Sequence, residues 1–156
     1  MKIAFIGHRK IEEKEVLRQK LKDSVINLIE KEGADTFLCG SRSEFNDLCY
    51  EVVTELKENY PRIRRIEVRA LNEYIPQIYL DITLKYYEKT VFPECVSGAG
   101  YRSYIKRNEA MIDMCDILIT YFDKNYSLMA GKVSGTREAV DYAQRKNKRI
   151  INLFDK

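Results

Sequence analysis

Two short apolar runs, each ending at a glycine and each followed by a long amphipathic stretch, limit what this chain can fold into. The first run is KIAFIG, and the segment Ile11–Glu32 after it carries apolar side chains at helical spacing. The second run is DTFLCGS, and the helical pattern after it stops before Tyr60-Pro61, because the residue before a proline disfavours helical backbone. Two consecutive strand–helix units predict a parallel sheet with right-handed crossovers.

Three further strands complete the predicted sheet. The segment Ile63–Ala70 alternates apolar and charged residues, which is typical of a sheet edge with a solvated arginine face. Two later runs, DILITYF and KRIINLF, are nearly continuously apolar, as buried parallel strands are. Helices are expected at Ser103–Cys115 and from about Gly135 to Lys146. Residues 1–156 are therefore predicted to form a single three-layer α/β/α Rossmann-like domain with a mainly parallel, five-stranded sheet.

The stretch from Leu71 to Gly100 is the least regular part of the chain. It holds two of the three prolines and several tyrosines. We expect an elaborated crossover with one short helix at Leu80–Tyr87. Insertions of this length often shape a binding site or an interface.

Composition excludes several classes of protein. The chain has 156 residues, of which 33% are charged and 45% hydrophobic, as in a single globular domain and unlike a disordered or fibrous chain. Its net charge of +3 is small for a dedicated nucleic-acid binder, so nucleic acid is not an expected partner, whereas an anionic small ligand is compatible.

The cysteines, the histidine and the apolar runs bear on metals and membranes. The four cysteines show no CxxC spacing and His8 is the one histidine, so no zinc ligand set is expected and the site needs no metal or cofactor. No apolar run approaches the length of a membrane span. We therefore expect a cytoplasmic protein with reduced thiols and no membrane partner.

Small residues follow three of the predicted strands or open the helices after them. In an open parallel sheet, ligands collect at the carboxyl ends of the strands. Glycine allows close approach of a phosphate to the backbone, and a helix N-terminus supplies N–H donors. The residues expected to converge on a ligand are Gly7, His8, Arg9, Gly40, Ser41, Ser134, Gly135 and Thr136.

Each of these features also has a purely structural interpretation. Glycine commonly ends a strand, and His8 is either a general base or a hydrogen-bonding pocket residue. Arg107, on the helix before the fourth predicted strand, is either a phosphate or carboxylate clamp or a solvated arginine. No Walker A pattern and no G-x-G-x-x-G follows the first strand, which disfavours a P-loop nucleotidase and a standard dinucleotide dehydrogenase.

The segment YIKRNEAMIDMCDILITYF, followed by SGTREAVDYAQRKNKRIINLF, resembles the SLOG superfamily. This Rossmann-like group includes the LONELY GUY phosphoribohydrolases and the DNA-processing protein Smf. In the phosphoribohydrolases an Arg-Lys-x-x-Met segment precedes a strand that starts with Asp, and Arg107, Met111 and Asp116 match it here. The likeness covers nearly the whole chain and is greatest to small bacterial members of unknown function.

The second family motif matches in part. In the phosphoribohydrolases it reads Gly-Gly-x-Gly-Thr-x-x-Glu, and Ser134-Gly135-Thr136 matches its core. The position of the catalytic glutamate is taken by Ala139, while Glu138 lies one residue early and so points about 100° away around the helix. This segment also resembles nucleoside deoxyribosyltransferases, whose late Gly-Thr helix carries a catalytic glutamate. That glutamate is likewise not matched in this chain.

The resemblance implies a ligand and two alternative activities. The family places an acid after the second strand, so Asp47 is either a ribose ligand or a first-turn helix acid. The leading interpretation is binding of a nucleoside phosphate or an ADP-ribose-like molecule by a sensor that forms homo-oligomers. The alternative is an enzyme that cleaves or transfers the N-glycosidic bond of nucleoside monophosphates, with Glu138, His8 or Asp47 as the acid or nucleophile.

Overall fold

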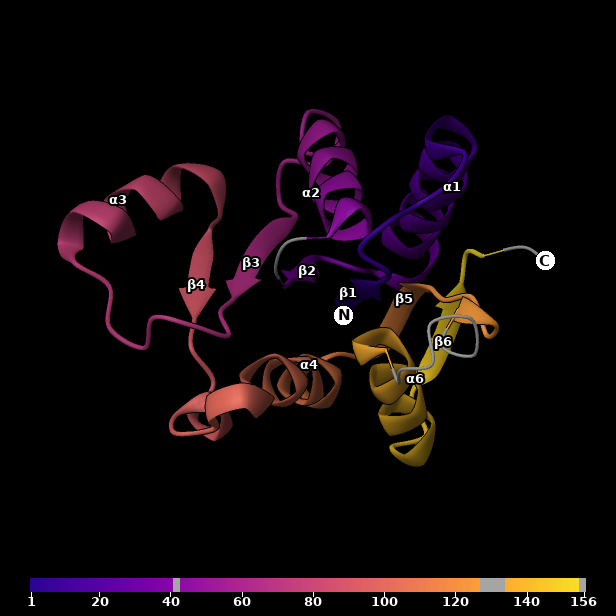
Figure 1. Ribbon diagram of the computed structural model, residues 1–156. Coiled ribbons are helices and arrows are strands. Elements are labelled where there is room, and N and C mark those ends of the chain that lie inside the picture. The colour runs from indigo at the N-terminus through magenta and orange to yellow at the C-terminus, as the bar shows by residue number, and fades with distance from the viewer. Residues whose placement is uncertain (41–42, 127–133, 155–156) are drawn as a thin grey trace.

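The computed structural model describes residues 1–40, 43–126 and 134–154. Within them the chain forms one fully parallel sheet in the order β4-β3-β2-β1-β5-β6 (Figure 1). The strands are β1 (Lys2–Gly7), β2 (Thr36–Cys39), β3 (Arg64–Val68), β4 (Lys89–Val91), β5 (Ile117–Tyr121) and β6 (Arg149–Asn152).

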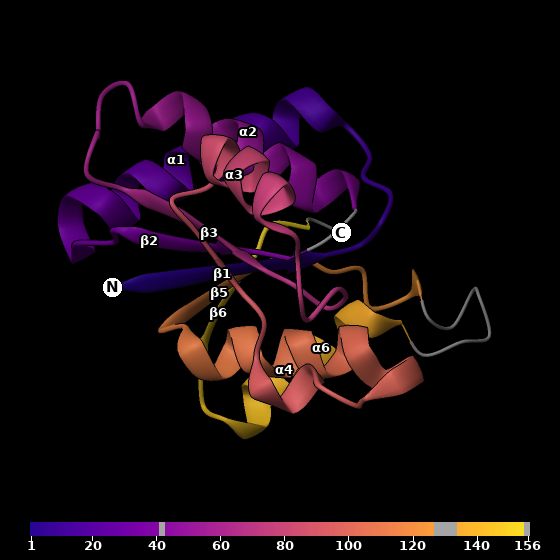
Figure 2. The ribbon, with the colours of Figure 1, turned by 90° about the vertical axis from the view of Figure 1, so that its left-hand side faces the viewer.

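Helices cover both faces of the sheet and produce the predicted three layers. Helices α1 and α2 lie on one face, α4 and α6 lie on the other, and α3 lies on the α1 and α2 side beyond β4 (Figures 1 and 2). None of the described helices has the length and apolar character needed to cross a bilayer. The helices are α1 (Lys14–Glu32), α2 (Glu44–Leu56), α3 (Gln77–Tyr86), α4 (Ser103–Met114) and α6 (Gly135–Arg145), with single 3₁₀ turns at Glu94–Val96 and Gly100–Arg102.

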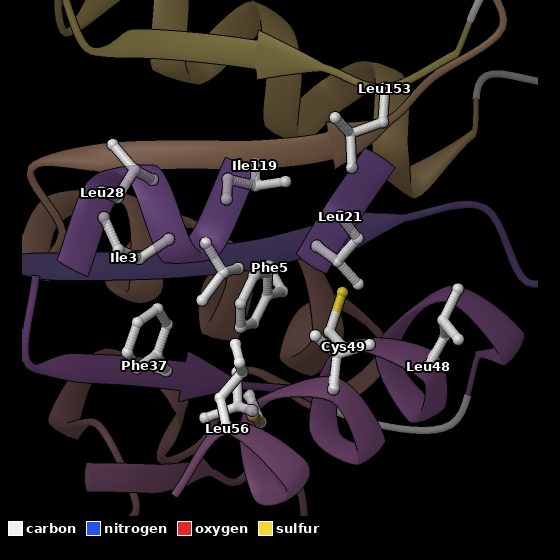
Figure 3. Close-up of a cluster of buried hydrophobic side chains, with 14 of the residues drawn as sticks. Ile3, Phe5, Leu21, Leu28, Phe37, Leu48, Cys49, Leu56, Ile119 and Leu153 are labelled. Atoms are coloured by element: carbon white, nitrogen blue, oxygen red, sulfur yellow. The ribbon is translucent and has the colours of Figure 1, made fainter. Parts of the chain in front are cut away.

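The apolar side chains of the strands alternate between two hydrophobic clusters, one under each helical layer. Phe5 and Phe37 stack on the face covered by α1 and α2, where Leu21 packs with them (Figure 3). Phe45 belongs to the same cluster. Leu118 and its neighbours pack with α4 and α6 on the other face. Strands buried on both sides explain why the sequence shows apolar runs instead of alternation.

The strand order reverses beside β1. The chain runs outward from β1 through β2 and β3 to β4, then returns so that β5 pairs with the free side of β1. At this boundary Gly7 is in register with Tyr121, so the carboxyl ends of β1 and β5 lie together. Such a reversal is where open α/β sheets bind their ligands.

The sheet has six strands, so the predicted count of five is wrong. The missed strand, β4, contains only three residues, and its sequence Lys-Thr-Val carries no apolar run. It follows α3, which begins at Gln77, three residues before the predicted start. Because β4 covers β3, the predicted edge strand is internal.

The internal position of β3 changes the environment of Arg65. Its guanidinium is buried and forms two hydrogen bonds to the Glu88 carboxylate, from NH2 to Oε1 at 2.8 Å and from Nε to Oε2 at 3.2 Å. Burial alone would raise the pKa of Glu88, but the hydrogen bonds from Arg65 and Lys57 outweigh it and hold the pKa at about 2. Arg65 is thus a structural ion-pair partner and not part of a solvated arginine face.

Gly7 is required by packing at the end of β1. A Cβ at this position would lie 2.3 Å from Cδ1 and 2.6 Å from Cγ of Phe45, and Phe45 is fully buried in the α2 layer. The missing side chain therefore lets α2 approach the carboxyl end of β1. Packing against Phe45 therefore explains the glycine at position 7, which was expected to contact the ligand.

We predict that Gly7→Ala destabilises the fold by about 1–3 kcal/mol, because overpacking a rigid core forces the ring or the backbone to shift. The measurement is the free energy of unfolding in urea. Gly135→Ala is the matched control, since no atom of the described residues lies within 4 Å of its added Cβ, and it is expected to be neutral or slightly stabilising. A Gly7→Ala protein as stable as the wild type would show that Phe45 does not require this glycine.

Candidate functional site

The carboxyl ends of the strands form one edge of the molecule, and several predicted site residues lie there. Gly7 ends β1 and Gly40 follows β2. The N-terminus of α6 lies at the same edge, below the sheet in Figure 2. Ser41 lies outside the described residues.

Arg107 and Gly40 are in direct proximity, although 67 positions separate them in the sequence. A Cβ on Gly40 would lie 3.0 Å from the Arg107 Cζ and 3.2 Å from its NH1. The NH1 group donates a hydrogen bond to the backbone carbonyl of Val68 at 3.3 Å, and Nε donates to the side-chain oxygen of Asn108 at 2.9 Å. The guanidinium is thus held at the carboxyl ends of β2 and β3, in the space that Gly40 leaves.

Arg107 is a buried cation. Its exposed fraction is 5%, and burial lowers the pKa of Arg107 to about 10, an effect that Tyr104 partly opposes. The guanidinium therefore stays charged at neutral pH. It also lies 5.7 Å from the ring centroid of Tyr104, within the range of a cation–π contact. A planar, buried guanidinium in this setting is suited to bidentate recognition of a phosphate or carboxylate.

The first turn of α6 begins at a serine cap. The Ser134 hydroxyl accepts a hydrogen bond from the backbone N–H of Arg137 at 3.0 Å. Gly135 is exposed, and Thr136 is buried at the start of the helix. The N–H groups of a first helical turn have no acceptor within the helix and carry partial positive charge, so this turn is suited to an anion.

The turn after β2 is organised by Asn46 more than by Asp47. The Asn46 side-chain oxygen accepts from the backbone N–H of Gly40 at 3.0 Å, and its own N–H donates to the Ser43 cap. Asp47 is exposed in the first turn of α2. Asn46 thus fixes the conformation at Gly40, a role that depends on side-chain direction and has no separate sequence signal.

His8 is buried and accepts a hydrogen bond. Its Nε2 accepts from the backbone N–H of Asp123 at 2.9 Å, and its ring lies 4.5 Å from that of Tyr126, centroid to centroid. Burial lowers the pKa of His8, although the Asp123 contact opposes this effect. A neutral imidazole therefore ties the end of β1 to the segment after β5. The Nε2 lone pair is engaged in that bond, which limits its use as a general base.

The remaining predicted residues are spread around this edge. Arg9 is exposed, and its backbone carbonyl accepts a hydrogen bond from the N–H of Glu44 at 2.9 Å. Glu138 is half-buried in the first turn of α6. Ala139, at the family's glutamate position, is 3% exposed and packs in the hydrophobic cluster under α4 and α6. The side chain at position 139 therefore points into the core.

A buried hydroxyl lies near the end of β5. Thr120 Oγ1 is fully buried and has no hydrogen-bond partner among the described residues. Leaving such a group unsatisfied costs about 1–3 kcal/mol. Within residues 1–40, 43–126 and 134–154, no group of three or more His, Cys, Asp or Glu side chains is arranged to hold a metal ion.

The single histidine allows a prediction about pH. Because burial lowers the pKa of His8 below 6.5, the unfolded chain takes up a proton that the folded chain resists as the pH falls below that value. The free energy of unfolding should therefore decrease between about pH 7 and 5.5, by at most about 1.4 kcal/mol per pH unit.

His8→Gln keeps an acceptor for the Asp123 N–H but removes the titration, so its stability should change less over the same interval. Urea unfolding of both proteins at several pH values measures the difference. Since the chain has no other histidine, parallel curves for the two proteins would show that His8 does not resist protonation.

The family comparison agrees with this architecture. The model described as the YspA SLOG family matches residues 5–155, which is nearly the whole chain and extends from the second half of β1 to beyond β6. No curated protein shows significant similarity to the chain. The parallel sheet, its reversal beside β1 and the extent of the match lead to one conclusion: the chain belongs to the YspA SLOG family.

Proposed function

We propose that this protein binds a nucleotide-derived ligand, a nucleoside phosphate or an ADP-ribose-like molecule, at the carboxyl ends of its strands and acts as a sensor of that ligand. SLOG membership suggests a nucleotide-related function in general. The observation that supports the finer proposal is the placement of the buried Arg107 guanidinium against Gly40, at the end of β2. A side chain at position 40 would occupy space beside this cation.

Two groups of different kinds would contact a phosphate in this proposal. Arg107 supplies full charge and a planar pair of donors, and the first turn of α6 supplies N–H groups and partial charge. Helices α4 and α6 lie together under the same face of the sheet (Figure 2). Gly135 is exposed at the start of α6, and within residues 1–40, 43–126 and 134–154 nothing lies within 4 Å of a Cβ built there. Asp47, exposed after β2, is the proposed ribose contact.

The environments of the candidate catalytic groups favour binding over bond cleavage. The family's glutamate position holds Ala139, which is part of the core. The Nε2 of His8 accepts from a backbone N–H. Glu138 lies one helical position from the family's carboxylate. A sensor needs none of these groups to act on the ligand, whereas a hydrolase requires a carboxylate that faces the sugar.

We predict that Arg107→Lys weakens binding of adenosine monophosphate or ADP-ribose by about tenfold or more, because one charge-assisted hydrogen bond of the bidentate pair is lost while the charge is kept. Isothermal titration calorimetry on the folded proteins measures the change. Arg149→Lys is the matched control, since Arg149 begins β6 at the opposite edge and pairs with Glu32. Equal ligand affinities of the Arg107→Lys protein and the control would show that Arg107 does not hold the phosphate through a bidentate contact.

A second variant tests the helix N-terminus separately. Gly135→Val should abolish phosphate binding while leaving the fold intact, because its added Cβ meets no atom of the part of the chain that the structure describes, while the side chain projects beside the N–H donors. Gly135→Ala serves as the smaller step at the same position. Undiminished binding by the folded valine variant would exclude α6 from the site.

A direct assay distinguishes the alternative activity, cleavage of the N-glycosidic bond, from ligand binding alone. We expect no release of free base from adenosine, inosine or guanosine monophosphate over hours, measured by liquid chromatography with a hydrolase of this superfamily as the positive control. Efficient release by the wild type that is lost in Glu138→Gln would replace the sensor proposal with the enzyme.

A further inference from the structure

Helix α3 stands apart from the other helices. It lies at the outer end of the sheet beyond β4 (Figure 1), and none of its ten residues is buried. It is attached at its C-terminal end, where the Tyr50 hydroxyl donates to the Tyr86 carbonyl at 3.0 Å and the Tyr50 ring lies 5.1 Å from that of Tyr87. A helix this short has little stability of its own and depends on packing.

The outward side of α3 is apolar. Ile78, Ile82 and Tyr86 lie four positions apart, and Tyr79 lies three positions before Ile82. We call these four residues the α3 stripe. The exposed fractions of Ile78, Tyr79, Ile82 and Tyr86 are 66, 60, 45 and 56%. Tyr74, just before the helix, is 89% exposed. Leu80, Thr83 and Tyr87 are half-buried on the opposite side. The stripe is thus a second apolar face in addition to the one that meets the protein.

The charges beside the stripe are few and opposite. Within α3 the one acidic residue is Asp81 and the one basic residue is Lys85, and both lie on the same flank of the stripe. The helix is therefore neutral overall. A membrane surface or a nucleic acid would require a cluster of cations, which α3 does not have.

We propose that the α3 stripe is the contact surface for a second copy of this chain, with the two α3 helices packed antiparallel through their stripes about a twofold axis that crosses them at the level of Thr83. Asp81 and Lys85 are equally distant from Thr83 along the helix, so each Asp81 faces the other copy's Lys85. The same symmetry brings the two Ile82 side chains together and packs Ile78 and Tyr79 against Tyr86 of the other copy. The surface is thus complementary to itself in charge as well as in apolar character.

The apolar area of the stripe fits an interface of ordinary size. A buried aromatic side chain covers about 150–250 Å². At exposed fractions of 89, 60 and 56%, Tyr74, Tyr79 and Tyr86 therefore present roughly 400 Å² together, to which Ile78 and Ile82 add further apolar area. A standard interface buries about 800 Å² per partner, of which somewhat more than half, about 450 Å², is apolar. The stripe can therefore supply the apolar part of a specific dimer contact.

The first test is the oligomeric state of the full chain by sedimentation equilibrium across micromolar concentrations. The wild type is expected to be dimeric and Ile82→Asp monomeric, because the variant places two carboxylates at the twofold axis. Val16→Asp is the matched control: Val16 is 53% exposed on α1, away from the stripe, and this variant should dimerise like the wild type. A wild type that stays monomeric at hundreds of micromolar, or an Ile82→Asp protein that still dimerises, overturns the proposal.

A charge exchange distinguishes a second copy from any other partner. Asp81→Lys alone should weaken the dimer by about tenfold, since two attractive pairs become repulsive. The double variant Asp81→Lys with Lys85→Asp restores both pairs, and its dimer affinity should return to within about threefold of the wild type. This recovery requires the antiparallel self-pairing. A double variant as weak as the single one would overturn it and indicate a different partner for the stripe.

Discussion

The pairing of β1 with β2 on one side and with β5 on the other is the constraint on which the rest of the structure depends. These parallel ladders set Gly7 beside Tyr121 and place Gly40 one strand away. They also force α1 and α2 onto one face and α4 and α6 onto the other. The groups proposed to contact the ligand therefore lie at one edge of the sheet because β1 pairs with both β2 and β5. The close approach of Phe45 to Gly7 shows that the end of β1 is tightly packed.

Much of the fold was predictable because the central strands are buried on both faces. Burial requires continuous apolar runs, and these stand out in the sequence at β1, β2 and β5. The edge is different: β4 has three partly exposed residues, so hydrophobicity does not distinguish it from a loop. The Arg65 ion pair with Glu88 could not be predicted either, since it depends on that missed strand.

Residue types in the sequence nominate candidates for the site but do not give their geometry. The sequence pointed to Gly40 and Arg107 independently, and only the topology shows that the glycine leaves space for the guanidinium. The acceptor role of His8 depends on the direction of a backbone N–H at Asp123, which no residue pattern encodes. Ala139 is a different case, because the sequence alone shows that it departs from the family motif. The structure adds that this position is buried in the core.

The proposed site would bind a phosphate-bearing nucleoside compound at the edge formed by Arg107, Gly40 and the start of α6. Mass spectrometry of the small molecules retained by the purified protein and released on denaturation tests this most directly. We expect a nucleoside phosphate or an ADP-ribose-like compound in near-stoichiometric amount from the wild type, and less of it from a folded Gly40→Ala protein, whose added Cβ would lie 3.0 Å from the Arg107 Cζ and shift the guanidinium. Retention of a compound without phosphate, or equal retention of the nucleotide by Gly40→Ala, would contradict it.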